Sequence, residues 1–341
     1  MSDVNALVLK QNPSTELMPV GDSLNQVSLS NESPVELPAL IVDAGSAASF
    51  VWEEFIYAKI RNPHTRAAYE RAIRQFLTHC EQLGKELMQI SPRDVGTYLD
   101  DLSYATATKK LHLSALKHFF DTLVSRHVLI LNPAASVRGE RLQVVEGKTP
   151  EISIEQARQL MGSIDTSSVV GLRDQAIIAI LIYTAARVGA IAKLRLGDFY
   201  DLGDQHCLRF SEKGSKSREI PVRHDLQNFI LDYLTAVDLQ DSDKKTPLFR
   251  TTIRKTKILT NNEMTANDMY RMVKRRLRKA DLPSQFSPHS FRVTTITDLL
   301  SQGVPLEDVQ NLAGHADPRT TRLYDRRQRK VTRNIVERIS I

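Results

Sequence analysis

Apolar residues recur at helical spacing through the first third of the chain. Between residues 69 and 80 they fall at i, i+3, i+4 and i+7, the spacing that lines one face of a helix. Ser91, with a proline after it and an acid three positions later, is typical of the start of a second helix, and a third is expected from Thr106 to His127. The positions expected to face the core are Tyr69, Ala72, Ile73, Phe76, Leu77, Cys80, Val95, Tyr98, Leu99, Leu102, Leu113, Leu116, Phe120, Leu123 and Val124. The sequence therefore predicts a helical domain over residues 47–136.

The pattern changes across residues 137–150, where Pro, Gly and polar residues are typical of a linker. Ser153 then begins a capping box, and a strongly apolar helix is expected from Leu172 to Ala186. The alternating runs HCLRF and REIPV, joined by a glycine-containing turn, predict a β-hairpin, after which helical spacing returns. The fold class is therefore mainly α with a small antiparallel β-sheet, and the second domain covers residues 151–341.

The first 46 residues follow neither pattern. They are rich in Ser, Asn, Pro, Val and acids without a sustained period, so a flexible acidic leader is expected over residues 1–46. The net charge of +6 at pH 7 is consequently uneven, because the leader is acidic and the rest of the chain is strongly basic. A basic body favours polyanions such as the phosphate backbone of nucleic acid, although many ordinary proteins share this feature.

Composition argues against a disulfide-rich, zinc-binding, membrane-spanning or secreted protein. Cys80 and Cys207 are too few and too far apart in sequence for a disulfide framework, and no Cys/His pattern indicates zinc. No run approaches the roughly 18 apolar residues of a membrane span, and the start lacks the order of a secretion signal. We expect a soluble protein of the cytoplasm with no membrane partner.

The helix expected after Ser287 and Pro288 carries two candidate site residues. It places His289 and Arg292 on one face near its N-terminus, where unpaired N–H groups and the helix dipole favour an anion. A histidine and an arginine at this spacing are also a common coincidence. The pair gains meaning only in combination with other residues.

A histidine and a tyrosine follow around a turn. Gly314 is expected to end a short helix, with His315 directly after it. Asp317 and Pro318 suit the start of a new helix that carries Tyr324. The histidine and the tyrosine are placed to bracket one small group, and the commoner alternative is a half-buried tyrosine whose hydroxyl reaches water.

Two further cations stand at unusual places. Arg187 ends an apolar helix where burial is expected to continue, so it needs an anionic partner, and an internal salt bridge with Asp198 is the alternative to a ligand. Lys213 lies at the tip of the expected hairpin with Lys216 and Arg218. Basic hairpin tips also serve solubility, so this group alone decides nothing.

Taken in order, these residues resemble the tyrosine recombinases, also called the phage-integrase family. The resemblance rests on the segments TAARVGAIAKLRLGDF, EKGSKSREIPV, SPHSFRVTTITDLLSQG and LAGHADPRTTRLYDRR, and it covers roughly residues 48–341. In the same pattern, 22 residues separate Arg292 from His315 and eight separate His315 from Tyr324. The resemblance implies a two-domain, C-shaped clamp in which a helical core-binding domain precedes an α+β catalytic domain.

The resemblance also implies a catalytic set, which comprises Arg187, Lys213, His289, Arg292, His315 and Tyr324. The two arginines and His315 would bind the scissile phosphate, and Tyr324 would attack it to give a 3′-phosphotyrosyl link and a free 5′-hydroxyl. Lys213 is the candidate acid for the departing oxygen, and His289 is the candidate base for the tyrosine. No metal, cofactor or ATP is expected, because arginines neutralise the developing charge.

One position departs from the family pattern. The family commonly has an acid three positions after the first arginine, and here that position is Ala190. Because this carboxylate orients active-site cations in the family, its absence raises the question of how Arg187 is held. Asp198 is the candidate substitute.

Other basic residues are candidate DNA contacts. Residues 271–279 hold six cations and no acid, and the third helix of the first domain is expected to enter a major groove as its counterpart does in the family. Both surfaces have a solvated face as the alternative. The candidate contacts are Lys109, Lys110, Lys117, Lys216, Arg218, Lys274 and Arg275. A last helix, VTRNIVERISI, is expected to pack on its own domain or on a neighbouring protomer.

These features predict a site-specific DNA recombinase. By the resemblance, it would act as a homo-tetramer on double-stranded DNA with specific target sites and exchange strands through a Holliday junction, in the cytoplasm and associated with the nucleoid. A non-catalytic DNA-binding accessory protein and a type IB topoisomerase-like relaxing enzyme are the alternatives.

Overall fold

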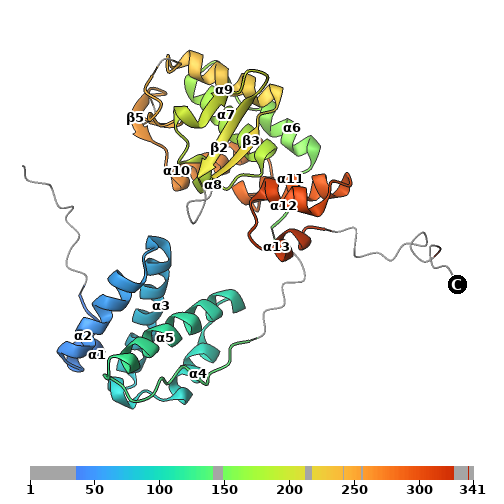
Figure 1. Cartoon of the computed structure of the whole chain (residues 1–341). Coiled ribbons are helices and arrows are strands. Elements are labelled where there is room, and N and C mark those ends of the chain that lie inside the picture. Colours follow the sequence, from blue (N-terminus) through green and yellow to red (C-terminus); the bar gives the residue numbers. More distant parts are fainter. Residues whose placement is uncertain are drawn as a thin grey trace, which may run out of the picture. The chain divides into compact units, whose positions relative to one another are not determined.

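The structure, a computed structural model, describes residues 36–140, 149–211, 217–240, 242–254, 256–325 and 337. The chain forms two compact units, and the boundary between them lies between Leu142 and Gln143. In Figure 1 the first unit, coloured blue to green, is built from helices, whereas the second, green to red, combines helices with strands.

Helices form the described part of the first unit. They are α1 (Ala39–Asp43), α2 (Ser46–Glu53), the π-helical turn η1 (Glu54–Lys59), α3 (Pro63–Gln82), the 3₁₀ turn η2 (Leu87–Gln89), α4 (Pro92–Asp101) and α5 (Thr106–Ser125). The Asn62 side chain accepts hydrogen bonds from two backbone N–H groups at the start of α3. Ser91 and Asp94 form the expected capping box of α4. The helix starts therefore follow the polar caps in the sequence.

The helical unit begins earlier than the sequence predicted. Helix α1 starts at Ala39, and its Leu40 and Ile41 side chains are 6% and 0% exposed in the core. The leader expected to reach residue 46 is therefore wrong over its last residues. The cause is length: a five-residue helix has too few apolar positions to show a period, although burying two aliphatic side chains stabilises it.

The apolar faces of α3 and α5 supply the core of this unit. The Trp52 and Phe55 rings pack edge-on against Phe119, with centroids 5.8 and 5.5 Å apart. Most expected core positions are buried, namely Ala72, Ile73, Phe76, Leu77, Cys80, Val95, Tyr98, Leu99, Leu113, Leu116, Phe120 and Leu123. The exceptions are half-buried: Tyr69 and Leu102 pack at the edge of the cluster, and Val124 is the third.

The second unit mixes helices with short strands. Its helices are α6 (Ile154–Gly162), α7 (Val169–Thr184), α8 (Val188–Ile191), the 3₁₀ turn η3 (Leu196–Asp198), α9 (His224–Ala236), α10 (Ala266–Lys279), α11 (Pro288–Ser301), α12 (Leu306–Ala313) and α13 (Pro318–Arg322). Its strands are β1 (Phe199–Asp201), β2 (His206–Ser211), β3 (Ser217–Pro221), β4 (Arg250–Thr252) and β5 (Leu259–Glu263).

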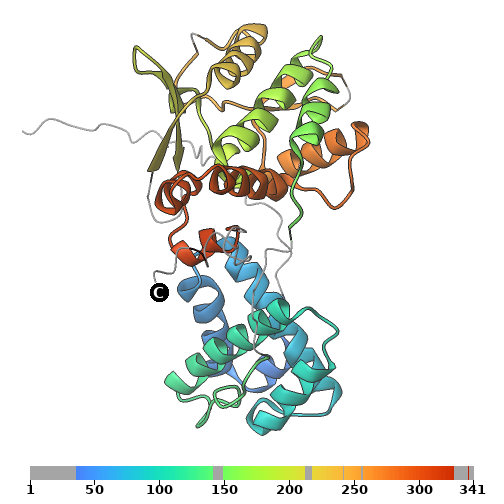
Figure 2. The ribbon, with the colours of Figure 1, turned by 90° about the vertical axis from the view of Figure 1, so that its right-hand side faces the viewer.

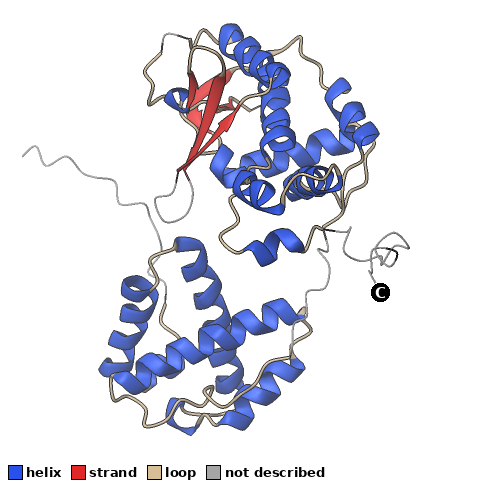
Figure 3. Cartoon of the chain, turned by 45° about the vertical axis from the view of Figure 1, so that its right-hand side comes forward, coloured by secondary structure: helices blue, strands red, loops and turns tan. Residues whose placement is uncertain are grey.

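The expected hairpin is the β2–β3 pair of a three-stranded antiparallel sheet in the order β1-β2-β3. Leu208 lies opposite Ile220, and both face the core. Strands β4 and β5 form a second, two-stranded sheet that the sequence did not predict. Figure 3 shows the strands in red at one side of this unit, with helices making up the rest.

Helix α7 is the centre of the second unit. Residues 176–181 of this helix are fully buried, and the helix packs against both α9 and α11. At Gly171 a Cβ would come within 1.8 Å of the Asp165 carbonyl oxygen, so only glycine allows this close approach. Helices α11 and α12, orange and red in Figure 2, lie side by side and share a small apolar cluster with the end of α7.

Candidate active site

Helix α11 holds the buried arginine of the site. Ser287 caps the helix and Pro288 occupies its first turn, as expected. Arg292 is only 1% exposed, and its guanidinium donates to the carbonyls of Ala185 and Ala313, the latter at 2.5 Å. These carbonyls lie at the ends of α7 and α12, so one buried cation ties three helices together.

Arg187 follows the end of α7 rather than forming part of it. The helix ends at Thr184, and Ala185 adopts a left-handed conformation with φ of 49°. Arg187 then stands exposed at the N-cap of α8. The Asp198 carboxylate accepts a hydrogen bond from the Arg195 backbone N–H at 2.9 Å. The salt bridge between Arg187 and Asp198 that the sequence allowed stays a prediction.

His315 is fixed in the turn after α12. Gly314 ends the helix with φ of 62°, the left-handed conformation expected of a glycine stop. The His315 backbone N–H donates to the Gln310 carbonyl at 3.1 Å, and the Gln310 side chain donates back to the His315 carbonyl at 3.0 Å. The ring is 8% exposed, and its Nδ1 lies 2.9 Å from Oγ1 of Thr321.

Positive charges surround both histidines. The His289 side chain is exposed at the surface of the chain, and partial loss of hydration, followed by the charges of Arg292 and Arg187, lowers its pKa. Burial also lowers the pKa of His315 to about 4, with further contributions from Arg292, Arg187, His289 and Arg218. Residues from four separate segments therefore act on one point, and the resulting field suits an anion.

Tyr324 lies against His315. The two rings stack with centroids 6.1 Å apart and an angle of 11° between their planes. The half-buried tyrosine also packs on the cluster that includes Ala185 and Leu300. Helix α13 begins at Asp317 and Pro318 as expected but ends at Arg322, so Tyr324 stands in the turn after the helix and not on it.

The hairpin brings Arg218 to the same place. Strand β3 sets Arg218 opposite Phe210, and the guanidinium carbon lies 5.5 Å from the centre of that ring. Its effect on the pKa of His315 places this charge near the cluster, although the sequence suggested only a DNA contact. Lys213 and Lys216, at the hairpin tip, lie outside the described residues.

Two family models match the chain. The model described as "Phage integrase family" matches residues 151–330, more than half of the sequence. The model described as "Phage integrase, N-terminal SAM-like domain" matches residues 52–127. The chain belongs to the phage integrase family.

Similar proteins are tyrosine recombinases of this family. Tyrosine recombinase XerC of Listeria innocua serovar 6a is 29% identical over 273 residues, which cover 76% of this chain and 86% of that protein. Tyrosine recombinase XerC of Chlamydia pneumoniae is 30% identical over 223 residues, which cover 64% and 67%. Family and relatives together support a DNA recombinase enzyme.

Solved structures share the fold. XerH site-specific recombinase bound to palindromic difH substrate, in a post-cleavage complex, matches with a TM-score of 0.63 at 20% identity, over 80% of each chain. A lambda integrase dimer bound to a COC′ core site matches with a TM-score of 0.61 at 15% identity, over 83% of this chain and 78% of that one. The predicted fold class, a helical domain followed by a mainly α catalytic domain, is confirmed.

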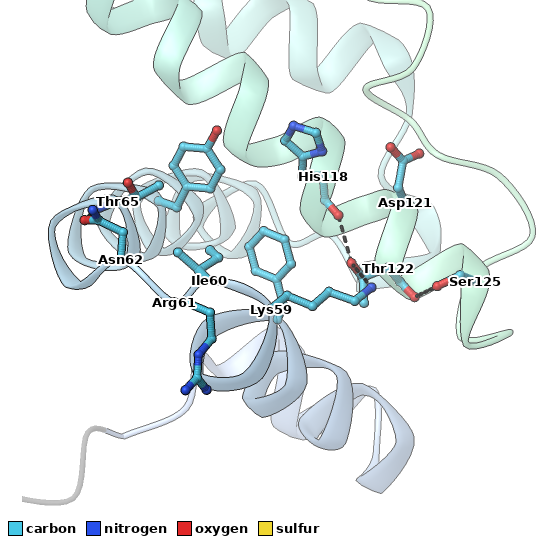
Figure 4. A pocket seen from close by; sticks show the side chains of 11 residues that line it. Lys59, Ile60, Arg61, Asn62, Thr65, His118, Asp121, Thr122 and Ser125 are labelled. Carbon is cyan, nitrogen blue, oxygen red and sulfur yellow. Dashed lines mark hydrogen bonds between the residues drawn. The ribbon is translucent and has the colours of Figure 1, made fainter. Parts of the chain in front are cut away.

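Two of the three candidate DNA-contact lysines on α5 have partners within the chain. The Lys109 ammonium forms an ion pair with Glu140 at 3.5 Å, and Lys117 donates to the Ala135 carbonyl at 3.2 Å. Lys110 is exposed. A hollow of about 600 Å³ lies between η1, α3 and the second half of α5. Figure 4 shows the Lys59 side chain reaching across it to Thr122, where the ammonium donates at 3.2 Å.

Helix α10 owes much of its charge to a buried ion-pair network. Its apolar face, Met269, Val273 and Leu277, is buried as expected. The fully buried Asp174 carboxylate pairs with Arg276 at 2.8 Å and with Arg275 at 3.2 Å.

Lys274, also on α10, donates to the backbone carbonyl of Phe286 at 2.9 Å. These contacts assign a structural role to cations that the sequence suggested as DNA contacts. Asp174 was missed because an acid within an apolar run has no local signal.

The described residues show neither a metal-binding cluster nor a membrane-spanning helix. No three His, Cys, Asp or Glu side chains gather as they would around a metal ion in the part of the chain described. No described helix is both long and apolar enough to cross a bilayer. The expected last helix lies beyond residue 325, outside the described range except for Glu337.

Proposed function

We propose that this chain is a site-specific DNA recombinase that cleaves and rejoins DNA through a 3′-phosphotyrosyl intermediate, with Tyr324 as the nucleophile. One observation carries the proposal: the Tyr324 ring stacks on His315, whose pKa is lowered by burial and then by the charges of Arg292 and Arg187. A nucleophile beside converging cations suits attack on a phosphodiester.

Arg187 and Arg292 would bind the non-bridging oxygens of the scissile phosphate. Guanidinium groups stay charged at working pH and donate paired hydrogen bonds, so they stabilise the charge that grows in the pentavalent transition state. Arg292 is held by backbone carbonyls, so its position is set before DNA arrives. Arg218 adds a further positive charge from β3.

Two other groups would transfer protons, and a third would donate a hydrogen bond. The lowered pKa of His289 leaves it neutral at pH 7, so it is suited to accept the phenol proton as Tyr324 attacks phosphorus. The bond from phosphorus to the 5′ oxygen breaks, and Lys213 would donate a proton to this oxygen. His315, also neutral, would donate a hydrogen bond to a non-bridging oxygen.

Rejoining reverses these steps with a second 5′-hydroxyl as the nucleophile. A phosphotyrosyl bond is close in energy to the phosphodiester that it replaces, so no ATP is consumed, and arginines take the place of a metal ion in neutralising charge. We place the reaction on double-stranded DNA with specific target sites, in a homo-tetramer that exchanges strands through a Holliday junction. The protein would accordingly be associated with the nucleoid.

The stacking of Tyr324 on His315 of the same chain supports attack in cis. Mixing experiments test this directly. A Tyr324→Phe protein combined with an Arg292→Ala protein restores cleavage only if one chain supplies the tyrosine to another chain's phosphate site. We expect no restoration.

The chemistry is tested with a nicked suicide substrate carrying the protein's own target site. We expect a covalent protein–DNA adduct that survives EDTA, is lost in Tyr324→Phe and persists in Tyr270→Phe, a matched control on α10 whose ring is 43% exposed. DNA binding without an adduct would favour the accessory-protein alternative. Adducts that relax supercoiled DNA without joining two sites would favour the topoisomerase-like alternative.

A further inference from the structure

The hydrogen bond between His315 and Thr321 leaves one proton to be assigned. Nδ1 of the imidazole and Oγ1 of the threonine are 2.9 Å apart, and Thr321 is 0% exposed. Either atom has the capacity to donate, depending on the tautomer of the ring. The assignment decides which nitrogen of His315 remains available for other contacts.

The hydroxyl of Thr321 settles the direction of this bond. If Nδ1 carried the proton and donated, the buried threonine proton would need a second acceptor, and its oxygen has no other hydrogen-bond partner among the described residues. If the threonine donates to Nδ1, its proton is satisfied and the ring proton sits on Nε2. A buried donor left without an acceptor is costly, so the second arrangement is favoured.

The neutral state of the ring makes this choice matter. An imidazole whose pKa is about 4 carries a single N–H at pH 7. With that proton on Nδ1, Nε2 would present a lone pair to a phosphate oxygen and repel it. With the proton on Nε2, the same nitrogen donates a hydrogen bond.

We propose that Thr321 is a positioning residue: by donating to Nδ1, it holds His315 in the tautomer whose Nε2–H donates to the scissile phosphate. The inference rests on the proposed recombinase function for its consequence, but the tautomer itself does not. The contacts of His315 with Gln310 and with the ring of Tyr324 fix the rest of the ring's position, so the threonine need only set its proton.

The tautomer is measured by NMR on the full chain with ¹⁵N-labelled histidine rings at pH 7. The chain has nine histidines, and His315→Gln identifies the signal concerned. We expect Nδ1 of His315 to be unprotonated and Nε2 to be protonated. In Thr321→Val, which keeps the shape but loses the hydroxyl, a mixture of tautomers is expected, and Thr321→Ser should restore the wild-type pattern.

Adduct formation on the suicide substrate supplies the second readout. We expect Thr321→Val to slow the single-turnover rate about tenfold with DNA affinity unchanged, and Thr321→Ser to recover most of the rate. Thr320→Val, the same change one position earlier on α13, is the matched control and should behave as the wild type.

Two results would overturn the assignment: a protonated Nδ1 in the wild type, or a Thr321→Val protein with wild-type tautomer and rate. If Thr321→Val does not fold, the wild-type spectrum alone decides. If the wild type shows Nε2–H but forms no adduct, the tautomer assignment stands and the proposed recombinase function fails. The two proposals are therefore separable.

Discussion

Replacing Arg292 by methionine removes a buried cation and both of its recorded hydrogen bonds while keeping a side chain of similar length. The guanidinium donates to the carbonyls of Ala185 and Ala313, at the ends of α7 and α12. The side chain is almost fully buried, so water cannot replace the lost donors. The variant should therefore lose stability as well as activity.

The magnitude follows from the two acceptors. Each buried acceptor left without its donor costs about 1–3 kcal/mol, so the pair costs roughly 4 kcal/mol. Removing the charge also removes its desolvation penalty, which offsets part of this, and we expect a net loss of about 3 kcal/mol in the free energy of unfolding. For a unit of this size, that corresponds to a fall of about 10 °C in Tm.

The measurement is thermal unfolding of the full chain followed by circular dichroism, together with adduct formation at a temperature where both proteins are folded. We expect at least a hundredfold loss of adduct. Arg292→Lys keeps the charge with a less suitable geometry, so its Tm and its adduct yield should lie between those of the wild type and of Arg292→Met. Arg319→Met, whose side chain is 88% exposed, is the matched control and should shift Tm by about 1 °C or less. A methionine variant with wild-type Tm would refute the tie between the helices.

Three further outcomes are expected. Asp174→Asn weakens the pairing of the largely buried Arg276 and should cost about 3 kcal/mol in urea unfolding, whereas Glu219→Gln on an exposed strand pair should leave the urea midpoint almost unchanged. The folded-state pKa of His315 lies below the ordinary histidine value, so the unfolded chain takes up the proton first as the pH falls. The free energy of unfolding should therefore drop by about 2 kcal/mol between pH 6.5 and 4. Denaturation curves of His315→Gln should show a smaller drop over the same pH range. Arg218→Met should slow adduct formation about tenfold while gel-shift affinity for DNA stays the same, and a proportional loss of both would contradict its place beside the phosphate.

Local elements were predictable where a short signal fixes the backbone. Ser91 and Ser153 form the expected capping boxes, and Gly314 adopts the left-handed stop. Each of these features depends on residues within four positions of one another, so a short stretch of sequence is enough to predict it. The five-residue helix at Ala39 escaped because its burial depends on distant partners.

The partners of the charged side chains were not predictable. Nothing in the sequence indicated that Arg275 shares the carboxylate of Asp174, about a hundred positions earlier. Such pairs form because tertiary packing brings distant side chains together, and the periodicity of apolar residues does not predict these long-range contacts. Candidate DNA contacts chosen from charge alone therefore included cations that hold the fold.

The departure at Ala190 can be set beside the electrostatics of the site. Burial, followed by the charges of Arg292 and Arg187, lowers the pKa of His315, and the same two arginines also lower the pKa of His289. Neutral histidines are what the proposed chemistry requires, one to accept the tyrosine proton and one to donate from a single defined nitrogen. Alanine at 190 is thus compatible with the proposed chemistry, which uses arginines and neutral histidines and assigns no step to a carboxylate at that position.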